Sequence, residues 1–349
     1  MTQSHGWAAQ SVAASLAPFQ FSRRALHDHD VEVDIQFCGV CHSDIHSVRD
    51  EWGNAVYPMV PGHEIVGRVA AVGSGVSRFK VGDLVGVGVI IDSCRTCPSC
   101  KAGEEQYCEV GVTLTYGATD RFGDLTFGGY SNNIVVDDHF VHTVSPKLSA
   151  AGVAPLLCAG ITTYSPLRHW KAGPNKKVGV IGLGGLGHMA LKFAHAFGAH
   201  VVQFTTSESK IDDAQRLGAD EVILSKDPDA MKKQASSFDF IIDTVSAPHD
   251  VNLYLQALKR DATYIQVGLP DQPPIINMGN LLFKRRAISG SIIGGMAETQ
   301  EMLDYCAEKN IVADVEVIPM QQINEAFDRV VKADVKYRFV IDMASLDRR

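Results

Sequence analysis

The alternation of apolar and polar residues divides the chain near Ser149. Before that point, residues 31–37 alternate with the period of a half-buried strand, and residues 65–73 and 83–90 read as two more strands. Glycines at the ends of these segments mark turns. Regular short strands with glycine turns predict an antiparallel, barrel-like β domain.

After Ser149, apolar residues recur at helical spacing over residues 153–171. An apolar strand over 176–181 then runs directly into a glycine-rich loop, and residues 188–197 show helical periodicity that ends at Gly198. The later strand candidates, with helical segments between them, are 201–204, 221–224, 238–244 and 263–268. Strands that alternate with helices predict an α/β domain with a doubly wound parallel sheet.

The sequence pattern of the tail predicts a helix over 298–308 and a last strand over 338–342. We expect this tail to return to the first domain. A chain of 349 residues is long enough for two domains. We therefore predict one domain formed by residues 1–152 and 291–349, and a nucleotide-binding domain formed by residues 153–290.

Charge and cysteine content limit the partners and the compartment. The formal net charge is −8 without a long basic run, which argues against nucleic acid or an anionic membrane as a partner. No apolar run approaches the roughly 20 residues that span a bilayer, and the start of the chain lacks a secretory signal pattern. Four of the eight cysteines lie between Cys94 and Cys108. This clustering suits metal binding in a reducing compartment, so we expect a cytoplasmic protein.

The glycine-rich loop has the form G-x-G-x-x-G, follows a strand and opens a helix. In that context, glycines allow a pyrophosphate to approach the backbone, and the helix start offers free N–H groups. A glycine-rich turn without a ligand is the alternative. The predicted cofactor-binding residues of the loop are Gly182, Leu183, Gly184, Gly185, Leu186 and Gly187.

The end of the next strand predicts which nucleotide binds. Sites for NAD usually carry an acid about 20 residues beyond the glycines, where it bonds the ribose hydroxyls. Here that region contains Thr205, Thr206, Ser207 and Lys210, whose hydroxyls and ammonium group suit a 2′-phosphate. Glu208 lies beyond the strand end, and we expect it to point away. These residues favour NADP(H) over NAD.

A compact cysteine cluster reads Cys94-x2-Cys97-x2-Cys100-x7-Cys108. Four thiolates form a closed tetrahedral shell around zinc and leave no open position for substrate. We therefore predict a structural zinc ion in this loop. Free thiols or disulfides are the alternatives.

A second set of potential metal ligands is scattered along the chain. Residues 37–46 gather two thiols, two imidazoles, a hydroxyl and a carboxylate, Gly62 is followed by His63 and Glu64, and Cys158 stands alone in an apolar run. One Cys, one His and a remote second Cys form the ligand set of catalytic zinc sites that keep one open position. The alternatives are a Cys38–Cys41 redox pair, surface histidines and a solvated Glu64.

The chain resembles the zinc-dependent medium-chain alcohol dehydrogenases, and within them the cinnamyl alcohol dehydrogenase group of NADPH-linked aldehyde reductases. The likeness extends to bacterial broad-range aldehyde reductases of that group. The resemblance implies a GroES-like β-barrel catalytic domain, a Rossmann domain for the cofactor, and a homodimer. The segments that carry the resemblance are 38–44, 57–64 with Gly67 and Gly73, the four-cysteine loop, 158–164, the glycine loop and 336–340.

This resemblance implies roles for individual residues. Cys41, His63 and Cys158 would bind the catalytic zinc ion, with Glu64 and Asp44 beside them. Some members of the family carry an acid after the last ligand, whereas Ala159 follows it here, which favours the plain Cys-His-Cys site.

Further roles implied by the resemblance lie around the zinc ligands. Ser43 would hydrogen-bond the substrate oxygen, and His46 would form the solvent end of a proton relay, so the catalytic residues would be these two and Glu64. Trp52 would line the substrate pocket, or it is an ordinary core tryptophan. The remaining cofactor contacts would be His42, Thr162, Val267, Ser291 and Arg338.

The expected function is hydride transfer between NADP(H) and a broad range of aromatic and aliphatic aldehydes or primary alcohols, with aldehyde reduction favoured. We expect two zinc ions per chain, a small-molecule substrate, and neither nucleic acid nor a membrane as partner. The alternatives are a zinc-free quinone reductase on the same fold, an NAD-dependent polyol dehydrogenase, and a non-catalytic NADPH-binding protein.

Overall fold

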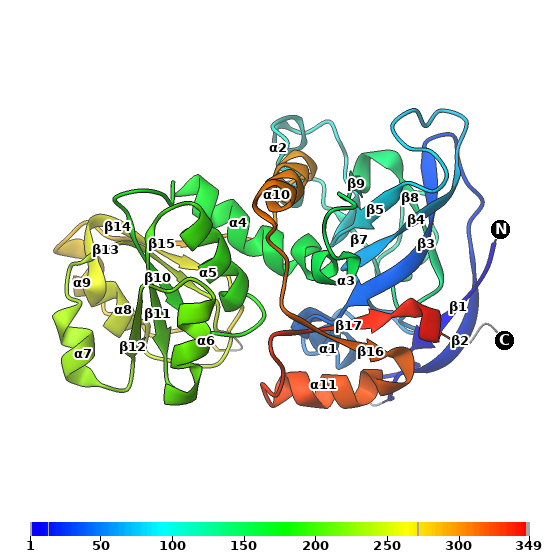
Figure 1. Cartoon of the computed structure of the whole chain (residues 1–349). Helices are drawn as coiled ribbons and strands as arrows, with labels where there is room; N and C mark the ends of the chain where they lie inside the picture. The colour runs from blue at the N-terminus through cyan, green and yellow to red at the C-terminus, as the bar shows by residue number, and fades with distance from the viewer. Residues whose placement is uncertain (1, 13, 271, 347–349) are drawn as a thin grey trace. The chain divides into compact units, whose positions relative to one another are not determined.

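The computed structural model describes residues 2–12, 14–270 and 272–346. The chain forms two compact units (Figure 1): unit 1 comprises Met1–Ile161 and Gly294–Arg349, and unit 2 comprises Thr162–Ile293. The sequence pattern placed these junctions at 152–153 and 290–291, and these limits stay a prediction. The predicted outer limits, residues 1 and 349, lie outside the described residues.

Unit 1 is built on a seven-stranded sheet, whose order is β16-β17-β3-β4-β5-β9 with β8 paired to β3. The pairings are antiparallel as predicted, except that β16 runs parallel to β17. The strands are β3 (Asp30–Gly39), β4 (Ile65–Val72), β5 (Leu84–Val87), β8 (Asn133–Asp137), β9 (Val141–Thr143), β16 (Val315–Pro319) and β17 (Arg338–Asp342).

The tail returns to the first domain, as the sequence predicts. Strand β17 pairs with β3, with Ile341 opposite Cys38, because both strands are apolar and buried over this stretch. Two further pairs lie in unit 1: β1 (Thr2–Ala8) with β2 (Ala17–Arg23), and β6 (Ile90–Asp92) with β7 (Thr113–Leu114).

The prediction of one strand over residues 83–90 is wrong in its continuity, since β5 ends at Val87 and β6 begins at Ile90. The strand is interrupted at these two residues because the carbonyl groups of Gly88 and Val89 accept hydrogen bonds from Thr115.

The helices of unit 1 are α1 (His42–Val48), α2 (Pro98–Lys101), α3 (Ala150–Val153), α10 (Met296–Lys309) and α11 (Ile323–Val331).

The helical pattern over residues 153–171 is interrupted. A 3-10 turn, Ala154–Leu157, precedes Cys158, and α4 (Ala159–His169) carries the chain from unit 1 into unit 2. Leu157 packs against Gly86 of β5, where an added Cβ would lie 2.9 Å from its Cδ1 atom. This packing ties the turn, and therefore Cys158, to the sheet of unit 1.

Unit 2 is a six-stranded parallel sheet with the order β12-β11-β10-β13-β14-β15 (Figure 1), which confirms the doubly wound prediction. The chain order reverses between β10 and β13, the position where such sheets bind ligands. The strands are β10 (Lys177–Ile181), β11 (His200–Thr205), β12 (Glu221–Leu224), β13 (Phe238–Asp243), β14 (Leu258–Gln266) and β15 (Ala287–Gly290). The helices are α5 (Gly187–Ala196), α6 (Ile211–Arg216), α7 (Pro228–Lys233), α8 (Val251–Ala257) and α9 (Gly279–Leu282).

A hydrophobic cluster supports one face of this sheet. Phe204 of β11 packs its ring 5.2 Å from that of Phe238 at the start of β13, and Leu255 of α8 is fully buried with them. Each such side chain contributes about 1.5–3 kcal/mol through burial. The cluster therefore holds the strands whose carboxyl ends carry the nucleotide-site candidates.

Within the described ranges, no single helix is long and apolar enough to cross a membrane. Two consecutive helical segments, Ala150–Leu157 and Ala159–His169, are together long and apolar enough to do so, but the chain bends by 59° between them.

Candidate zinc and nucleotide sites

The first metal-site candidate begins where β3 ends and α1 starts. Cys41 is the residue before α1, and its backbone N–H donates to Asp44 Oδ2 at 2.9 Å. Asp44 is fully buried in the first turn of the helix, where a carboxylate is also favoured by the helix dipole. This local capping fixes the backbone that presents the Cys41 thiol.

Asp44 also orients the imidazole of His63. Its carboxylate lies 3.1 Å from His63 Nδ1 and accepts hydrogen bonds from the Gly62 N–H and the Tyr130 hydroxyl, each at 3.1 Å. A buried carboxylate needs such partners. Because Nδ1 faces Asp44, the other ring nitrogen, Nε2, is left as a potential ligand atom, and it is buried without a hydrogen-bond partner.

Four potential ligand residues converge around this nitrogen. Ligand atoms of Cys41, His63, Glu64 and Cys158 all lie within 4.8 Å of one another, and the two sulfurs are 3.9 Å apart. The hydrogen bond between these thiols lowers the pKa of Cys41 and raises that of Cys158. Two sulfurs and an unpartnered imidazole nitrogen fit zinc, which prefers this donor chemistry.

Glu64 lies at the same cluster and pairs with Arg338 of β17. One carboxylate oxygen contacts the guanidinium group, and the other, Oε2, is buried without a partner. Burial raises the pKa of Glu64 to about 7, although the Arg338 charge opposes this effect. Gly39 is required here, because a Cβ atom at that position would overlap the Glu64 carboxylate. The solvated-carboxylate alternative for Glu64 is therefore wrong.

Sequence reasoning missed two contributors to this site. Tyr130 is fully buried and holds Asp44, and the Tyr116 ring lies 5.8 Å from that of His63. It also missed that Arg338, predicted to contact the cofactor, pairs with Glu64. Arg338 is a charged residue at the start of the apolar strand Arg338–Asp342, and this position indicates a buried partner of opposite charge. The positions of the two tyrosines in the sequence give no such indication.

The other predicted residues of this region lie on or beside α1. Ser43 is half-buried, and the exposed His42 stacks on His46 at 4.7 Å. His46 Nδ1 contacts the Glu51 carboxylate, and its ring lies 5.3 Å from that of Trp52. Trp52 is 45% exposed, so the core-tryptophan alternative is wrong. The roles of these residues in the pocket and relay stay predictions.

The four-cysteine loop brings its sulfurs together, and ligand atoms of Cys94, Cys97, Cys100 and Cys108 lie within 4.8 Å of one another. Backbone N–H groups of Cys97 and Cys94 point at the sulfurs of Cys94 and Cys108, at 3.3 and 3.4 Å. The N–H groups of Thr96 and Cys97 lower the pKa of Cys94 to about 6. All four are free cysteines, so the disulfide alternative is wrong, and the closed sulfur shell fits a structural zinc ion.

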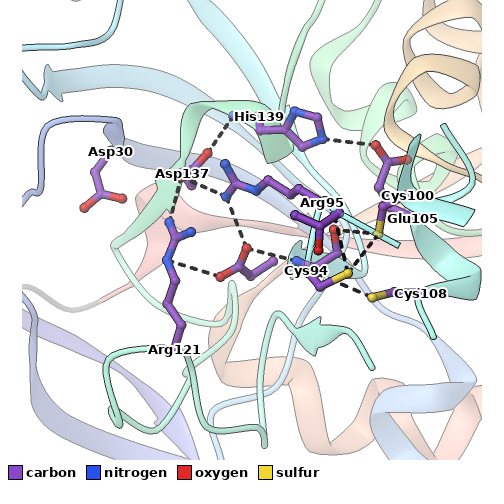
Figure 2. A network of polar contacts seen from close by, with 12 residues as sticks. Asp30, Cys94, Arg95, Cys100, Glu105, Cys108, Arg121, Asp137 and His139 are labelled. Carbon is purple, nitrogen blue, oxygen red and sulfur yellow. Dashed lines mark hydrogen bonds and ion pairs between the residues drawn. The ribbon is translucent and has the colours of Figure 1, made fainter. Parts of the chain in front are cut away.

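Ion pairs anchor this loop to unit 1 (Figure 2). Arg95 lies 2.8 Å from Asp137 at the end of β8. The Glu105 carboxylate lies 3.0 Å from His139 Nε2, and it also accepts the Met296 N–H at the start of α10. Both ends of the cysteine loop are therefore held by charged contacts to neighbouring segments.

The glycine loop of unit 2 joins β10 to α5 with the backbone geometry that a phosphate cradle needs. Gly182 has φ +86°, and an added Cβ there would lie 2.6 Å from Val245 Cγ2. A Cβ at Gly187 would overlap the Gly182 carbonyl group, whereas one at Gly184 would point into open space. Open space beside Gly184 at a helix start fits a pyrophosphate.

The end of β11 supplies polar groups beside this loop. The strand ends at Thr205, one residue beyond its predicted end, and Lys210 Nζ donates to the Leu183 carbonyl group at 3.0 Å. Ser207 follows the strand, and Glu208 is exposed at the start of a 3-10 turn. A strand end with hydroxyls and a lysine, and an exposed acid only in the following turn, fits a nucleotide with a 2′-phosphate.

The remaining predicted cofactor contacts lie in unit 2. Thr162 is buried, and Thr206 is exposed just after β11. The backbone N–H groups of Val267 and Ser291 donate to Asp243 and Gln266, the last residues of β13 and β14, at 2.9 and 3.1 Å. Their contacts with a cofactor stay predictions.

Comparisons with known proteins identify the family of both domains. Residues 27–146 match the family model "Alcohol dehydrogenase GroES-like domain", and residues 185–308 match "Zinc-binding dehydrogenase". The chain is 56% identical to aldehyde reductase YahK of Escherichia coli over 97% of each chain. It is 53% identical to NADP-dependent alcohol dehydrogenase C 1 of Mycolicibacterium smegmatis over 99% of each chain.

A solved structure shares the fold along the whole chain. The cinnamyl alcohol dehydrogenase of Helicobacter pylori, determined in complex with NADP(H), matches with a TM-score of 0.92 and 42% identity, covering 98% of this chain and 99% of that one. With two zinc-site candidates in unit 1 and a dinucleotide-type fold in unit 2, the chain belongs to the zinc-binding alcohol dehydrogenases that combine a GroES-like domain with a Rossmann domain.

Proposed function

We propose that the protein catalyses hydride transfer between NADP(H) and a broad range of aldehydes and primary alcohols, and that it favours aldehyde reduction. The observation that carries this proposal is the cluster of Cys41, His63 and Cys158 with an unpartnered imidazole nitrogen. Relatives named aldehyde reductase and NADP-dependent alcohol dehydrogenase support the substrate class and the cofactor.

In this proposal, Cys41, His63 and Cys158 hold the catalytic zinc ion. When bound, zinc supplies a Lewis acid that stabilises negative charge on the substrate oxygen. Asp44 keeps the His63 ring oriented toward that position through its contact with Nδ1. Glu64 stays beside the ligands because Arg338 holds one of its oxygens.

NADPH supplies the hydride, and side chains of α1 supply the proton. Ser43 donates its hydroxyl proton to the substrate oxygen as negative charge develops there. His46, paired with Glu51 and partly open to solvent, replaces that proton. The reverse sequence removes a proton from an alcohol before oxidation.

Unit 2 binds the nucleotide in this proposal. The pyrophosphate lies against residues 182–187, where the backbone at Gly184 is open. Thr205, Thr206, Ser207 and Lys210 bind the 2′-phosphate, and Lys210 is already held over the loop by Leu183.

Lys210→Ala is therefore expected to raise the KM for NADPH by at least about tenfold, because one charge-assisted contact is worth roughly 1.5–3 kcal/mol. The KM for NADH should change little. Steady-state kinetics with both nucleotides provide the measurement, and Lys232→Ala, which alters an exposed lysine of α7, is the matched control. Equal effects on the two nucleotides would refute the role of Lys210.

A direct assay tests the proposed activity. The purified protein should oxidise NADPH in the presence of benzaldehyde and should contain about two zinc ions per chain, as the two groups of potential metal ligands predict. Activity with a quinone and no zinc would favour the quinone reductase alternative. Activity with a polyol and NAD would favour the polyol dehydrogenase, and nucleotide binding without turnover would favour the non-catalytic role.

We also propose that the protein acts in the cytoplasm as a homodimer that pairs through the β15 edge of unit 2. Strand β15 is an edge strand without a charged residue to protect it. Large apolar side chains in and around this strand in the sequence are exposed, which is typical of an interaction surface. The residues are Leu269, Ile275, Met278, Leu282, Phe283, Ile288 and Ile292.

Replacing Ile275 and Phe283 by arginine is expected to convert the dimer into monomers, because these side chains are 89% and 91% exposed in the single chain. Light scattering after size-exclusion chromatography measures the mass. Val81→Arg, at an exposed valine of unit 1, should leave the dimer intact. A monomeric wild type, or a dimeric double variant, would contradict this assignment.

A further inference from the structure

Within unit 2, the carboxyl end of β13 and the residues that follow it pack against the glycine loop. Asp243 lies opposite Ile181, the last residue of β10. The next residue, Thr244, donates from both its backbone N–H and its hydroxyl to the Ile181 carbonyl group, at 3.1 and 2.6 Å. Val245 packs so close to Gly182 that only glycine fits there. The position of the 244–249 segment therefore affects the loop that we assign to the pyrophosphate.

A fully buried carboxylate holds this segment. Asp243 Oδ1 accepts the Val245 N–H at 3.0 Å, and Oδ2 accepts the Tyr264 hydroxyl at 2.5 Å. The Asp243 main-chain carbonyl group accepts the N–H groups of Val267 and Gly268, at 2.9 and 3.0 Å. Asp243 thus joins the strand end, the loop that follows it, and the end of β14.

His249 supplies the remaining partner of Asp243, and its surroundings favour the imidazolium form. Nε2 lies 3.1 Å from Asp243 Oδ2, and Nδ1 lies 2.9 Å from the Ala247 carbonyl oxygen. Both ring nitrogens face acceptors, and only the cation has a proton on each. A neutral ring would leave a nitrogen lone pair against either a carboxylate or a carbonyl oxygen.

Other titratable groups also surround the His249 ring. Asp250 is its neighbour in sequence, Tyr264 OH lies 3.5 Å from Nε2, and the Tyr254 ring lies 5.9 Å away. The hydrogen bond with Asp243 raises the pKa of His249, burial lowers it, and Asp250 adds to the rise. The net rise agrees with the geometry.

We propose that the His249 cation is a positioning residue that holds the 244–249 segment in place for NADP(H), and that loss of its proton weakens nucleotide binding without changing the chemistry of hydride transfer. This inference depends on the nucleotide site proposed above. Because the folded-state pKa is raised, the contact with Asp243 is complete below the ordinary pKa of histidine and is lost as pH rises through the raised value. Nucleotide affinity should therefore fall over that interval.

The test measures the Kd of NADPH by its fluorescence from pH 6 to 9 in the wild type and in His249→Gln. Wild-type affinity should exceed that of the variant by roughly fivefold at low pH, and the two should converge at high pH. Comparing the two proteins cancels the ionisation of the 2′-phosphate, which is common to both. His200→Gln, at a half-exposed histidine of the same unit, should match the wild type throughout.

A second measurement does not depend on the folding of a variant. If the proton on His249 favours binding, then bound NADPH must raise the pKa of His249, since the coupling is reciprocal. Imidazole NMR signals of the wild type, titrated with and without NADPH, report that shift. The kcat at saturating NADPH should be equal in the wild type and in His249→Gln.

The outcomes separate this inference from the proposed function. A protein that binds no NADPH at any pH would refute the nucleotide site itself. NADPH binding with parallel pH profiles in the wild type and His249→Gln, or with an unshifted His249 titration, would overturn the role of His249 alone.

Discussion

His63→Ala is expected to remove one of the two zinc ions per chain and to lower kcat/KM for aldehyde reduction by at least about 10³-fold, since Lewis-acid stabilisation is worth several kcal/mol. The variant removes the buried Nε2 atom, which has no hydrogen-bond partner and lies among the potential ligand atoms of Cys41 and Cys158. Metal analysis and steady-state kinetics provide the two measurements.

Two further variants make the result specific. His29→Ala, at an exposed histidine of unit 1, should keep both zinc ions and full activity. Cys100→Ser should instead lose the ion of the four-cysteine loop, and it should reduce stability more than it affects the chemical step. A His63→Ala protein with two zinc ions and wild-type turnover would show that this imidazole is not a ligand.

Arg338→Met is expected to lower the free energy of unfolding by about 3–5 kcal/mol, the usual cost of leaving one member of a buried ion pair without its partner. Glu64 is fully buried and Arg338 is 6% exposed, so solvent cannot replace the lost contact. Urea denaturation measures this loss.

The double variant Arg338→Met with Glu64→Gln should recover much of the stability, because it leaves no uncompensated charge. The same proteins also test the role implied by family resemblance. If Arg338 instead binds the cofactor phosphate, Arg338→Met will raise the KM for NADPH over that for NADH and leave stability unchanged.

Local patterns predicted the framework of the molecule. The strand–glycine loop–helix unit over residues 176–197 was predicted within a residue or two, because strand burial, glycine conformation and helix periodicity are all local signals. Strand β15 was missed because its residues are mostly exposed and show no alternation. The parallel pairing of β16 with β17 was missed because it depends on how the tail packs.

The metal-site candidates were predictable where the chemistry itself is unusual. Closely spaced cysteines such as those of the four-cysteine loop indicate a metal-binding cluster. The ligand atoms of Cys41, His63 and Cys158 converge, and they match the set that the sequence and the family resemblance suggested. The partners that hold the site were not predictable. Tyr130 and Arg338 lie 86 and 274 residues from Asp44 and Glu64, and no local pattern records contacts at such separations.

In the proposed mechanism, two sulfurs and one imidazole nitrogen in unit 1 bind a zinc ion that serves the chemistry. Anomalous diffraction from crystals of the purified protein, measured on both sides of the zinc absorption edge, tests this binding most directly. We predict one zinc peak within bonding distance of Cys41 Sγ, His63 Nε2 and Cys158 Sγ, and a second peak among the sulfurs of the four-cysteine loop. A fully active protein with no zinc peak at the first position would contradict it.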